Sequence, residues 1–192
     1  VATNLTRDLV NTPSADMAPM HLAEEAKKLA GKGITVKIMD QKEMERRGMR
    51  AALAVARGSD HPPVGVHLSY RPRGAKKKIA VVGKAVTFDS GGLNIKVGDG
   101  MTTMKIDMAG AATVVGLFKA IADLKPQIEV HGIFLAVENM PDGSAYRYLY
   151  LQSNPVNWAL GLLGVILSGA FLIAWMFHPL AERLRSPLPL SG

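Results

Sequence analysis

Hydrophobic and polar residues recur along the first part of the chain with the periods that distinguish strands from helices. From Ile34 to Met39 apolar residues alternate with polar ones, which is typical of a half-buried strand. Short apolar or alternating segments predict strands over 34–39, 64–70, 78–82 and 129–137. Longer or cap-flanked segments predict helices over 5–10, 19–30, 40–47, 49–56 and 107–123. Strands that alternate with helices favour an α/β fold, with a partial mixed or parallel sheet flanked by helices.

Local signals place several helix ends. Pro19 suits a first helical turn, and Gly31 and Gly33 end the helix that it begins. Asp40 followed by Glu43 is typical of a capping box, in which two side chains satisfy free backbone N–H groups at a helix start.

Composition excludes several kinds of site. The chain has 192 residues, of which 48% are hydrophobic and 20% charged, as in ordinary globular proteins. It contains no cysteine, which excludes disulfides, thiolate zinc sites, iron–sulfur clusters and cysteine nucleophiles.

The formal net charge of +7 permits an anionic partner. The most basic run, RPRGAKKK at 71–78, admits two interpretations: a nucleic-acid patch or a solvated loop between strands. We favour the loop, because no aromatic side chain interrupts the run to stack on bases. No nucleic-acid partner is therefore expected.

The C-terminal part has a different character. Residues 158–177 read WALGLLGVILSGAFLIAWMF, an uncharged run long enough for a transmembrane helix and thus for membrane association. The alternative is a buried helix of a large soluble protein. We therefore expect a soluble domain over 1–147, a junction over 148–157, the apolar helix, and a Pro-rich polar tail over 178–192.

The residues with candidate chemistry lie between Gly83 and Ala112. Lys84, Asp89 and Asp107 combine an amine with two carboxylates near a predicted strand, which suits a hard divalent cation. A lysine binds a metal only as the neutral amine, so it must lose its proton. By spacing alone, an ordinary strand–loop–helix connection with a salt bridge is the favoured interpretation. The five histidines show no ligand spacing.

The same segment resembles a known family. VGKAVTFDSGGLNIK, MTTMKIDMAGAATVVG and VENMPDGSAYR are similar to consecutive blocks of the leucyl (cytosol) aminopeptidases, which are two-metal exopeptidases. NLTRDLVNTPSADMAP and ALAVARGSDHPPVGVHLSY are similar to earlier blocks, so the resemblance spans residues 3–147. It implies hydrolysis of N-terminal, leucine-like residues from peptides with a free N-terminus, in the cytoplasm, using two Mn or Zn ions.

The resemblance also implies residue roles. Lys84, Asp89 and Asp107 correspond to metal ligands, with Asp89 bridging the two ions. Lys96 corresponds to the catalytic lysine that stabilises the developing oxyanion. Met104 corresponds to a residue lining the pocket for the first side chain, and Lys84, Asp89 and Lys96 also contact substrate. Ala85 replaces the usual glycine, a small change whose methyl group could crowd the turn carrying Lys84.

One family block is missing from the 192 residues. The block NTDAEGR supplies the remaining carboxylate ligands and an arginine, and the resemblance stops at Arg147 before it. At most one metal ion is therefore expected here, with little or no activity, and the family hexamer is doubtful.

Three hypotheses remain open at this stage. The chain is an active peptidase completed by ligands from another chain, a membrane-anchored module without catalysis, or a fusion product of two unrelated gene pieces.

Overall fold

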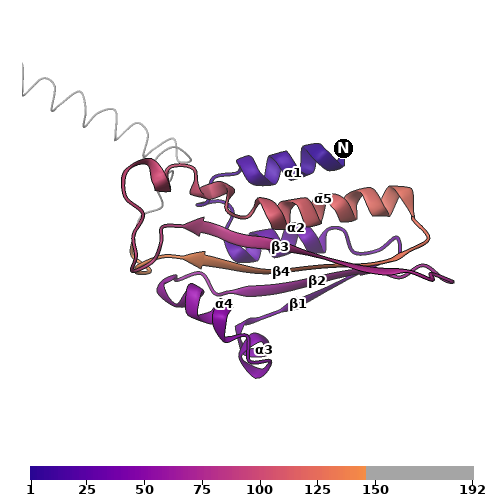
Figure 1. Cartoon of the computed structure of the whole chain (residues 1–192), viewed down its shortest axis with the longest axis horizontal. Coiled ribbons are helices and arrows are strands. Elements are labelled where there is room, and N and C mark those ends of the chain that lie inside the picture. Colours follow the sequence, from indigo (N-terminus) through magenta and orange to yellow (C-terminus); the bar gives the residue numbers. More distant parts are fainter. Residues whose placement is uncertain (146–192) are drawn as a thin grey trace, which may run out of the picture. The chain divides into compact units, whose positions relative to one another are not determined.

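The computed structural model describes residues 1–145, which all lie in one compact unit, Val1–Tyr150 (Figure 1). Its α-helices are α1 Ala2–Asn11, α2 Pro19–Lys27, α3 Gln41–Arg46, α4 Arg50–Val55 and α5 Ala109–Leu124. Its strands are β1 Ile34–Met39, β2 Val64–Tyr70, β3 Lys78–Asp89 and β4 Glu129–Asn139. Short 3₁₀ turns occupy Ala56–Gly58, Gly98–Met101 and Met104–Ile106.

The sheet is mixed, in the order β1-β2-β4-β3. β1 pairs with β2 and β2 with β4 in antiparallel fashion, whereas β3 and β4 are parallel. Helix α5 joins the parallel pair, as a parallel connection requires. The α/β class expected from the sequence is confirmed, and the sheet is mixed rather than all parallel.

The core lies between one face of the sheet and the layer of α1, α2 and α5. Leu22 of α2, Phe118 of α5, and Val66 and Phe134 of the central strands are at most 1% exposed. Figure 1 shows α1 and α5 on this side of the sheet and α3 and α4 on the other. The even-numbered residues of β2 and β4 face the core, which is the period-two burial expected of strands.

Most predicted elements occur within a few residues of their expected positions, and the differences concern the site. β3 continues to Asp89 instead of ending at Val82, because its pairing with β4 persists through a segment of weak strand propensity. Helix α5 begins at Ala109, so Asp107 precedes the helix instead of starting it.

The start of α3 also differs in detail. The Asp40 carboxylate accepts a hydrogen bond from the Glu43 N–H at 2.8 Å, as an N-cap does. The Glu43 carboxylate does not complete a capping box. It accepts hydrogen bonds from Arg46 and Arg47, which lower the pKa of Glu43 to about 2.

Within residues 1–145, no helix has both the length and the apolar character needed to cross a bilayer. The longest of them, α5, has 16 residues. The predicted transmembrane helix over 158–177 lies outside the described residues, as do the whole junction (148–157) and the tail (178–192). The basic run falls in the loop between β2 and β3 and at the start of β3, where Arg71 and Lys78 pair with Glu129.

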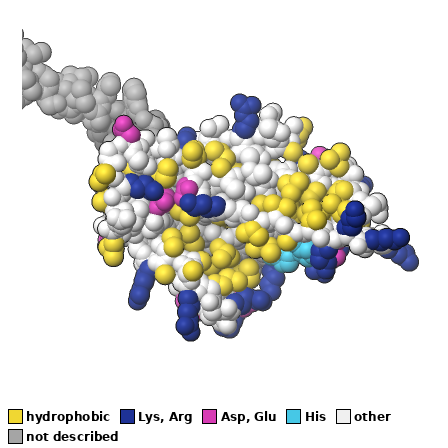
Figure 2. All heavy atoms as spheres, in the orientation of Figure 1, with side chains coloured by type: hydrophobic (Ala, Val, Ile, Leu, Met, Phe, Trp, Pro, Cys, Tyr) yellow, Lys and Arg dark blue, Asp and Glu magenta, His cyan; other side chains and the backbone are white. Residues whose placement is uncertain are grey.

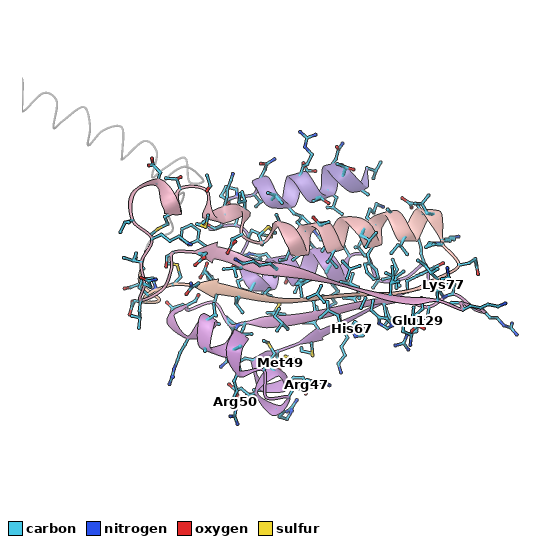
Figure 3. The ribbon with its side chains drawn as sticks, viewed as in Figure 1. Arg47, Met49, Arg50, His67, Lys77 and Glu129 are labelled. Carbon is cyan, nitrogen blue, oxygen red and sulfur yellow. The ribbon has the colours of Figure 1, made fainter. Side chains whose placement is uncertain are left out.

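A chain of polar contacts crosses the sheet face opposite α5 (Figure 3). His67 Nε2 lies 2.8 Å from His131 Nδ1, and His131 Nε2 lies 2.9 Å from a Glu129 oxygen. Burial lowers the pKa of His67, and the nearby His131, Arg71 and Lys37 act in the same direction. In Figure 2, the histidine side chains visible at the surface lie beside Lys and Arg side chains.

The lowered pKa of His67 predicts that the stability of the fold depends on pH. The unfolded chain takes up a proton at this histidine near pH 6.5, whereas the folded chain keeps His67 neutral to lower pH. The free energy of unfolding should therefore fall as the pH drops from 7 to 5, and His67→Gln should reduce that fall. Urea unfolding at both pH values measures it, with His61→Gln as the control. An unchanged pH dependence in His67→Gln would contradict the assignment.

Candidate metal centre

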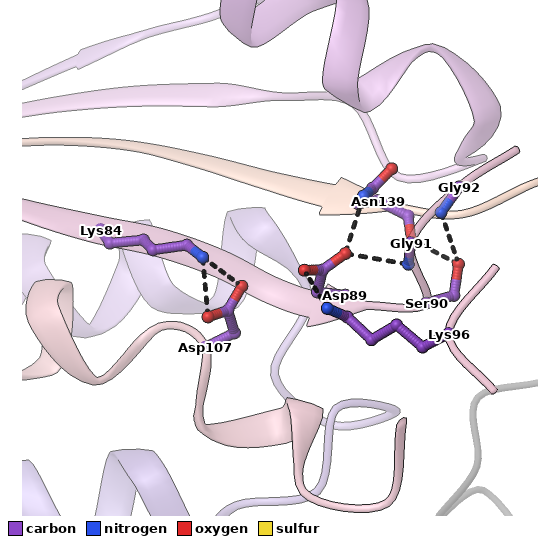
Figure 4. A network of polar contacts seen from close by, with 8 residues as sticks. All are labelled: Lys84, Asp89, Ser90, Gly91, Gly92, Lys96, Asp107 and Asn139. Atoms are coloured by element: carbon purple, nitrogen blue, oxygen red, sulfur yellow. Dashed lines mark hydrogen bonds and ion pairs between the residues drawn. The ribbon is translucent and has the colours of Figure 1, made fainter. Parts of the chain in front are cut away.

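The centre is built at the carboxyl end of the parallel pair β3 and β4 (Figure 4). Lys84 and Asp89 are five residues apart on β3, and an odd spacing puts side chains on opposite faces of a regular strand. The pairing with β4 shifts register between Val86 and Asp89, where three steps on β3 match two on β4. This β-bulge returns Asp89 to the face of Lys84.

Lys84 is paired with Asp107, from the segment just before α5. The ammonium Nζ lies 2.8 Å from Asp107 Oδ1, to which it donates, and 2.7 Å from Oδ2, outside hydrogen-bond geometry. The backbone also links the two segments, because the Val86 N–H donates to the Asp107 carbonyl at 3.3 Å. Asp107 is thereby fixed beside the edge of β3 that does not pair with β4.

The second lysine–carboxylate pair joins Asp89 and Lys96. Lys96 Nζ lies 3.2 Å from Asp89 Oδ2. Asp89 Oδ1 accepts hydrogen bonds from Asn139 Nδ2 at 2.7 Å and from the Gly91 N–H at 2.9 Å. Burial alone would raise the pKa of Asp89, but the hydrogen bonds from Asn139, Gly91 and Lys96 together outweigh it and hold that pKa below its usual value. Asp89 is thus ionised at neutral pH.

The turn after Asp89 depends on glycine. Gly91 has φ +93°, and a Cβ placed on it would lie 2.2 Å from the Asn94 carbonyl oxygen. The turn folds back so that the Lys96 N–H donates to the Ser90 carbonyl at 2.8 Å. This closure brings the Lys96 side chain to Asp89.

The structure thus brings the four residues together in two pairs, Lys84 with Asp107 and Asp89 with Lys96. Met104 lies in the 3₁₀ turn three residues before Asp107 and is partly buried. The expectation for Ala85 is wrong. Ala85 lies within β3, not in a turn, and its methyl group is 2% exposed in the core, on the side of the strand away from Lys84.

Asn139 is a site residue that sequence reasoning missed. It is the last residue of β4 and lies opposite Asp89 in the sheet register. The signal was its place in the VENMP motif at the end of a predicted strand.

The donor types suit a divalent cation, but the described donor set is incomplete. Asp107 Oδ2 is buried and accepts no hydrogen bond among the described residues, so the Lys84 ammonium at 2.7 Å meets its charge without satisfying it as an acceptor. Carboxylate oxygens and a neutral amine are suitable ligands for Mn or Zn. Residues 1–145 contain no group of three or more His, Asp or Glu arranged to hold a metal, so the set is short of a complete shell.

Comparison with known proteins decides the family. The catalytic-domain model of the cytosol aminopeptidase family matches residues 4–149, which is most of the chain. This chain belongs to the cytosol aminopeptidase family. The family resemblance expected from the sequence is therefore confirmed, and with it the assignment to a metallopeptidase family.

Cytosol aminopeptidase relatives match the same part of the chain. A probable cytosol aminopeptidase of Persephonella marina is 57% identical over 145 residues, covering 75% of this chain and 29% of the relative. The corresponding protein of Aquifex aeolicus is 55% identical over 148 residues, covering 76% of this chain and 30% of the relative. The chain thus spans less than a third of the length of these relatives.

A solved structure supports the same fold and a metal in the family. The bottromycin maturation enzyme BotP in complex with Mn is 40% identical, with a TM-score of 0.69. The match covers 76% of this chain and 32% of BotP.

Proposed function

We propose that this chain supplies part of a metal-dependent aminopeptidase site, which removes N-terminal, leucine-like residues from peptides in the cytoplasm. The observation that carries the proposal is the buried oxygen Asp107 Oδ2, which accepts no hydrogen bond among residues 1–145 and whose charge faces the Lys84 ammonium at 2.7 Å, in a cytosol aminopeptidase chain. A buried carboxylate needs a positive charge beside it, which the Lys84 ammonium supplies here and a divalent cation would supply if Lys84 bound it as the neutral amine.

The ligands are Lys84, Asp89 and Asp107. Asp107 would hold the cation with its carboxylate, and Lys84 would hold it as the neutral amine. Asp89 contributes Oδ2, since hydrogen bonds occupy its other oxygen. The bound cation supplies Lewis-acid polarisation of the scissile carbonyl.

Lys96 acts as the catalytic residue. It keeps its proton and places a positive charge next to the carbonyl oxygen as negative charge develops there. Its side chain is one-third exposed, so a substrate can reach the ammonium group. Met104 contacts the first side chain of the peptide, and the substrate's free amino group lies near Lys84 and Asp89.

The chain of 192 residues holds one cation, and its peptidase activity is little or none. Asp89 is the only one of the three ligands that corresponds to a ligand of the second ion. A two-metal site stabilises both the attacking and the leaving atoms, and it loses that function when one ion is missing.

The experiment measures binding as well as turnover. L-leucine phosphonic acid, a tetrahedral anion, is titrated calorimetrically into the 192-residue chain with and without Mn²⁺, in parallel with hydrolysis of L-leucine p-nitroanilide. We expect phosphonate binding that requires Mn²⁺ and is about 10-fold weaker in Lys96→Ala, consistent with the loss of one charge-assisted contact.

Metal binding itself should be unchanged in Lys96→Ala, because Lys96 is not a ligand. A Mn²⁺-loaded chain that does not bind the phosphonate would refute the proposed function. A Lys96→Ala variant with full phosphonate affinity would refute the role of Lys96.

A further inference from the structure

Asn139 contacts the metal centre through both its side chain and its backbone (Figure 4). Its amide Nδ2 donates to Asp89 Oδ1 at 2.7 Å. Its backbone carbonyl accepts from the Ser90 N–H at 3.0 Å and from the Ser90 hydroxyl at 2.7 Å. The backbone therefore anchors the turn after β3, whereas the side chain acts on the Asp89 carboxylate alone.

The two oxygens of Asp89 have different surroundings. Oδ1 accepts two hydrogen bonds, from Asn139 and from the Gly91 N–H, and these occupy both of its lone pairs. Within residues 1–145, Oδ2 has the Lys96 ammonium at 3.2 Å as its only charged partner, and a lysine can move away on its flexible stem. Oδ2 is thus the oxygen left for a cation.

The space and the charges around the Asn139 side chain suit an amide. A Cβ on Gly92 would lie 2.6 Å from Asn139 Oδ1, so the glycine leaves the room that the amide needs. The amide donates to Oδ1 without adding a charge, whereas a carboxylate at this position would repel Asp89.

We propose that Asn139 is a positioning residue for metal binding: its amide holds Asp89 so that the carboxylate binds the cation through Oδ2 alone. This inference rests on the proposed function, because it requires Asp89 to be a ligand. Outer partners that orient a ligating group typically affect metal affinity 10- to 100-fold.

The test compares three variants of the 192-residue chain. Their Mn²⁺ affinity is measured by titration monitored with electron paramagnetic resonance, and their thermal midpoint of unfolding is measured without metal. Asn139→Ala removes the amide and keeps the backbone bonds to Ser90. We expect its Mn²⁺ affinity to fall about 10- to 100-fold. Ser90→Ala loosens the turn but keeps the amide, so it should lower the thermal midpoint and change the affinity less. Asn94→Ala removes an exposed amide from the same loop and should change neither quantity.

A spectroscopic readout separates orientation from general loosening. In Asn139→Ala the freed Oδ1 can join Oδ2 on the cation, and two-oxygen binding narrows the splitting of the carboxylate stretches. Infrared difference spectra of Mn²⁺-loaded minus metal-free chain, labelled with ¹³C-aspartate, should show this narrowing in Asn139→Ala and not in Ser90→Ala.

The outcomes distinguish this inference from the proposed function. If the unmodified chain binds no Mn²⁺, the proposed function fails and the role of Asn139 with it. If the unmodified chain binds Mn²⁺ and Asn139→Ala binds it equally well, only the role of Asn139 is overturned. Equal losses of affinity in Asn139→Ala and Ser90→Ala, without spectral narrowing, would likewise overturn it.

Discussion

Asp107→Asn is expected to lower the affinity of the chain for Mn²⁺ on the order of 100-fold, which is about 2.7 kcal/mol of binding free energy. The substitution removes the ionised oxygen Oδ2, which is buried and has no hydrogen bond among residues 1–145. An amide keeps the shape of the side chain and loses the charge that attracts the cation.

The same substitution should hardly change metal-free stability. The Lys84 side chain is 60% exposed, so its ion pair with Asp107 contributes less than about 1 kcal/mol. Asparagine can keep an amide oxygen as acceptor for the Lys84 ammonium, which limits that loss.

The measurement is a Mn²⁺ titration together with urea unfolding of the metal-free chain. Asp99→Asn is the control, because Asp99 is an exposed carboxylate in the same segment. Retained affinity in Asp107→Asn, or an equal loss in Asp99→Asn, would show that Asp107 is not a ligand.

The second large effect concerns the contact between β3 and α5. A Cβ on Gly83 would lie 2.5 Å from the backbone of Gly110, and one on Gly110 would lie 2.6 Å from the Lys84 nitrogen. Such backbone contacts cannot be relieved by rotating a side chain. Gly83→Ala should therefore lower the free energy of unfolding by about 3 kcal/mol, at the upper end of overpacking effects.

Urea unfolding tests this expectation. Gly100→Ala is the matched control, because its Cβ would meet only the Lys96 Cβ at 3.7 Å. The double variant Gly83→Ala/Gly110→Ala should lose less than the sum of the single losses, since the first methyl group already separates the strand from the helix. A Gly83→Ala variant as stable as Gly100→Ala would mean that the two elements do not pack this closely in solution.

The periodicity of the sequence predicts most of the fold. β1 and β2 begin and end where their apolar alternation predicts, because one face of each strand is buried in the core. The extension of β3 to Asp89 depends on pairing with β4, about fifty residues away in the chain, which local propensity does not report. The β-bulge that puts Lys84 and Asp89 on one face is likewise a property of the pairing and not of either segment alone.

For the site too, the sequence predicts the local features, whereas the contacts between distant segments required the structure. Spacing places Lys84, Asp89 and Asp107 near one strand but does not distinguish a metal centre from a salt bridge, and family similarity supplied that distinction. The two pairings and the buried oxygen of Asp107 became visible only in three dimensions. Asn139 lies fifty residues from Asp89, so only the sheet register identifies it as a partner.

The central claim is that Lys84, Asp89 and Asp107 form a site for one divalent cation. The most direct test is the Mn²⁺ stoichiometry of the 192-residue chain, measured by titration with electron paramagnetic resonance of free Mn²⁺ and compared with the chain carrying Lys84→Ala and Asp107→Asn together. We predict one tightly bound Mn²⁺ per chain, and none in the double variant. Two bound ions, or one ion that remains in the double variant, would contradict this assignment.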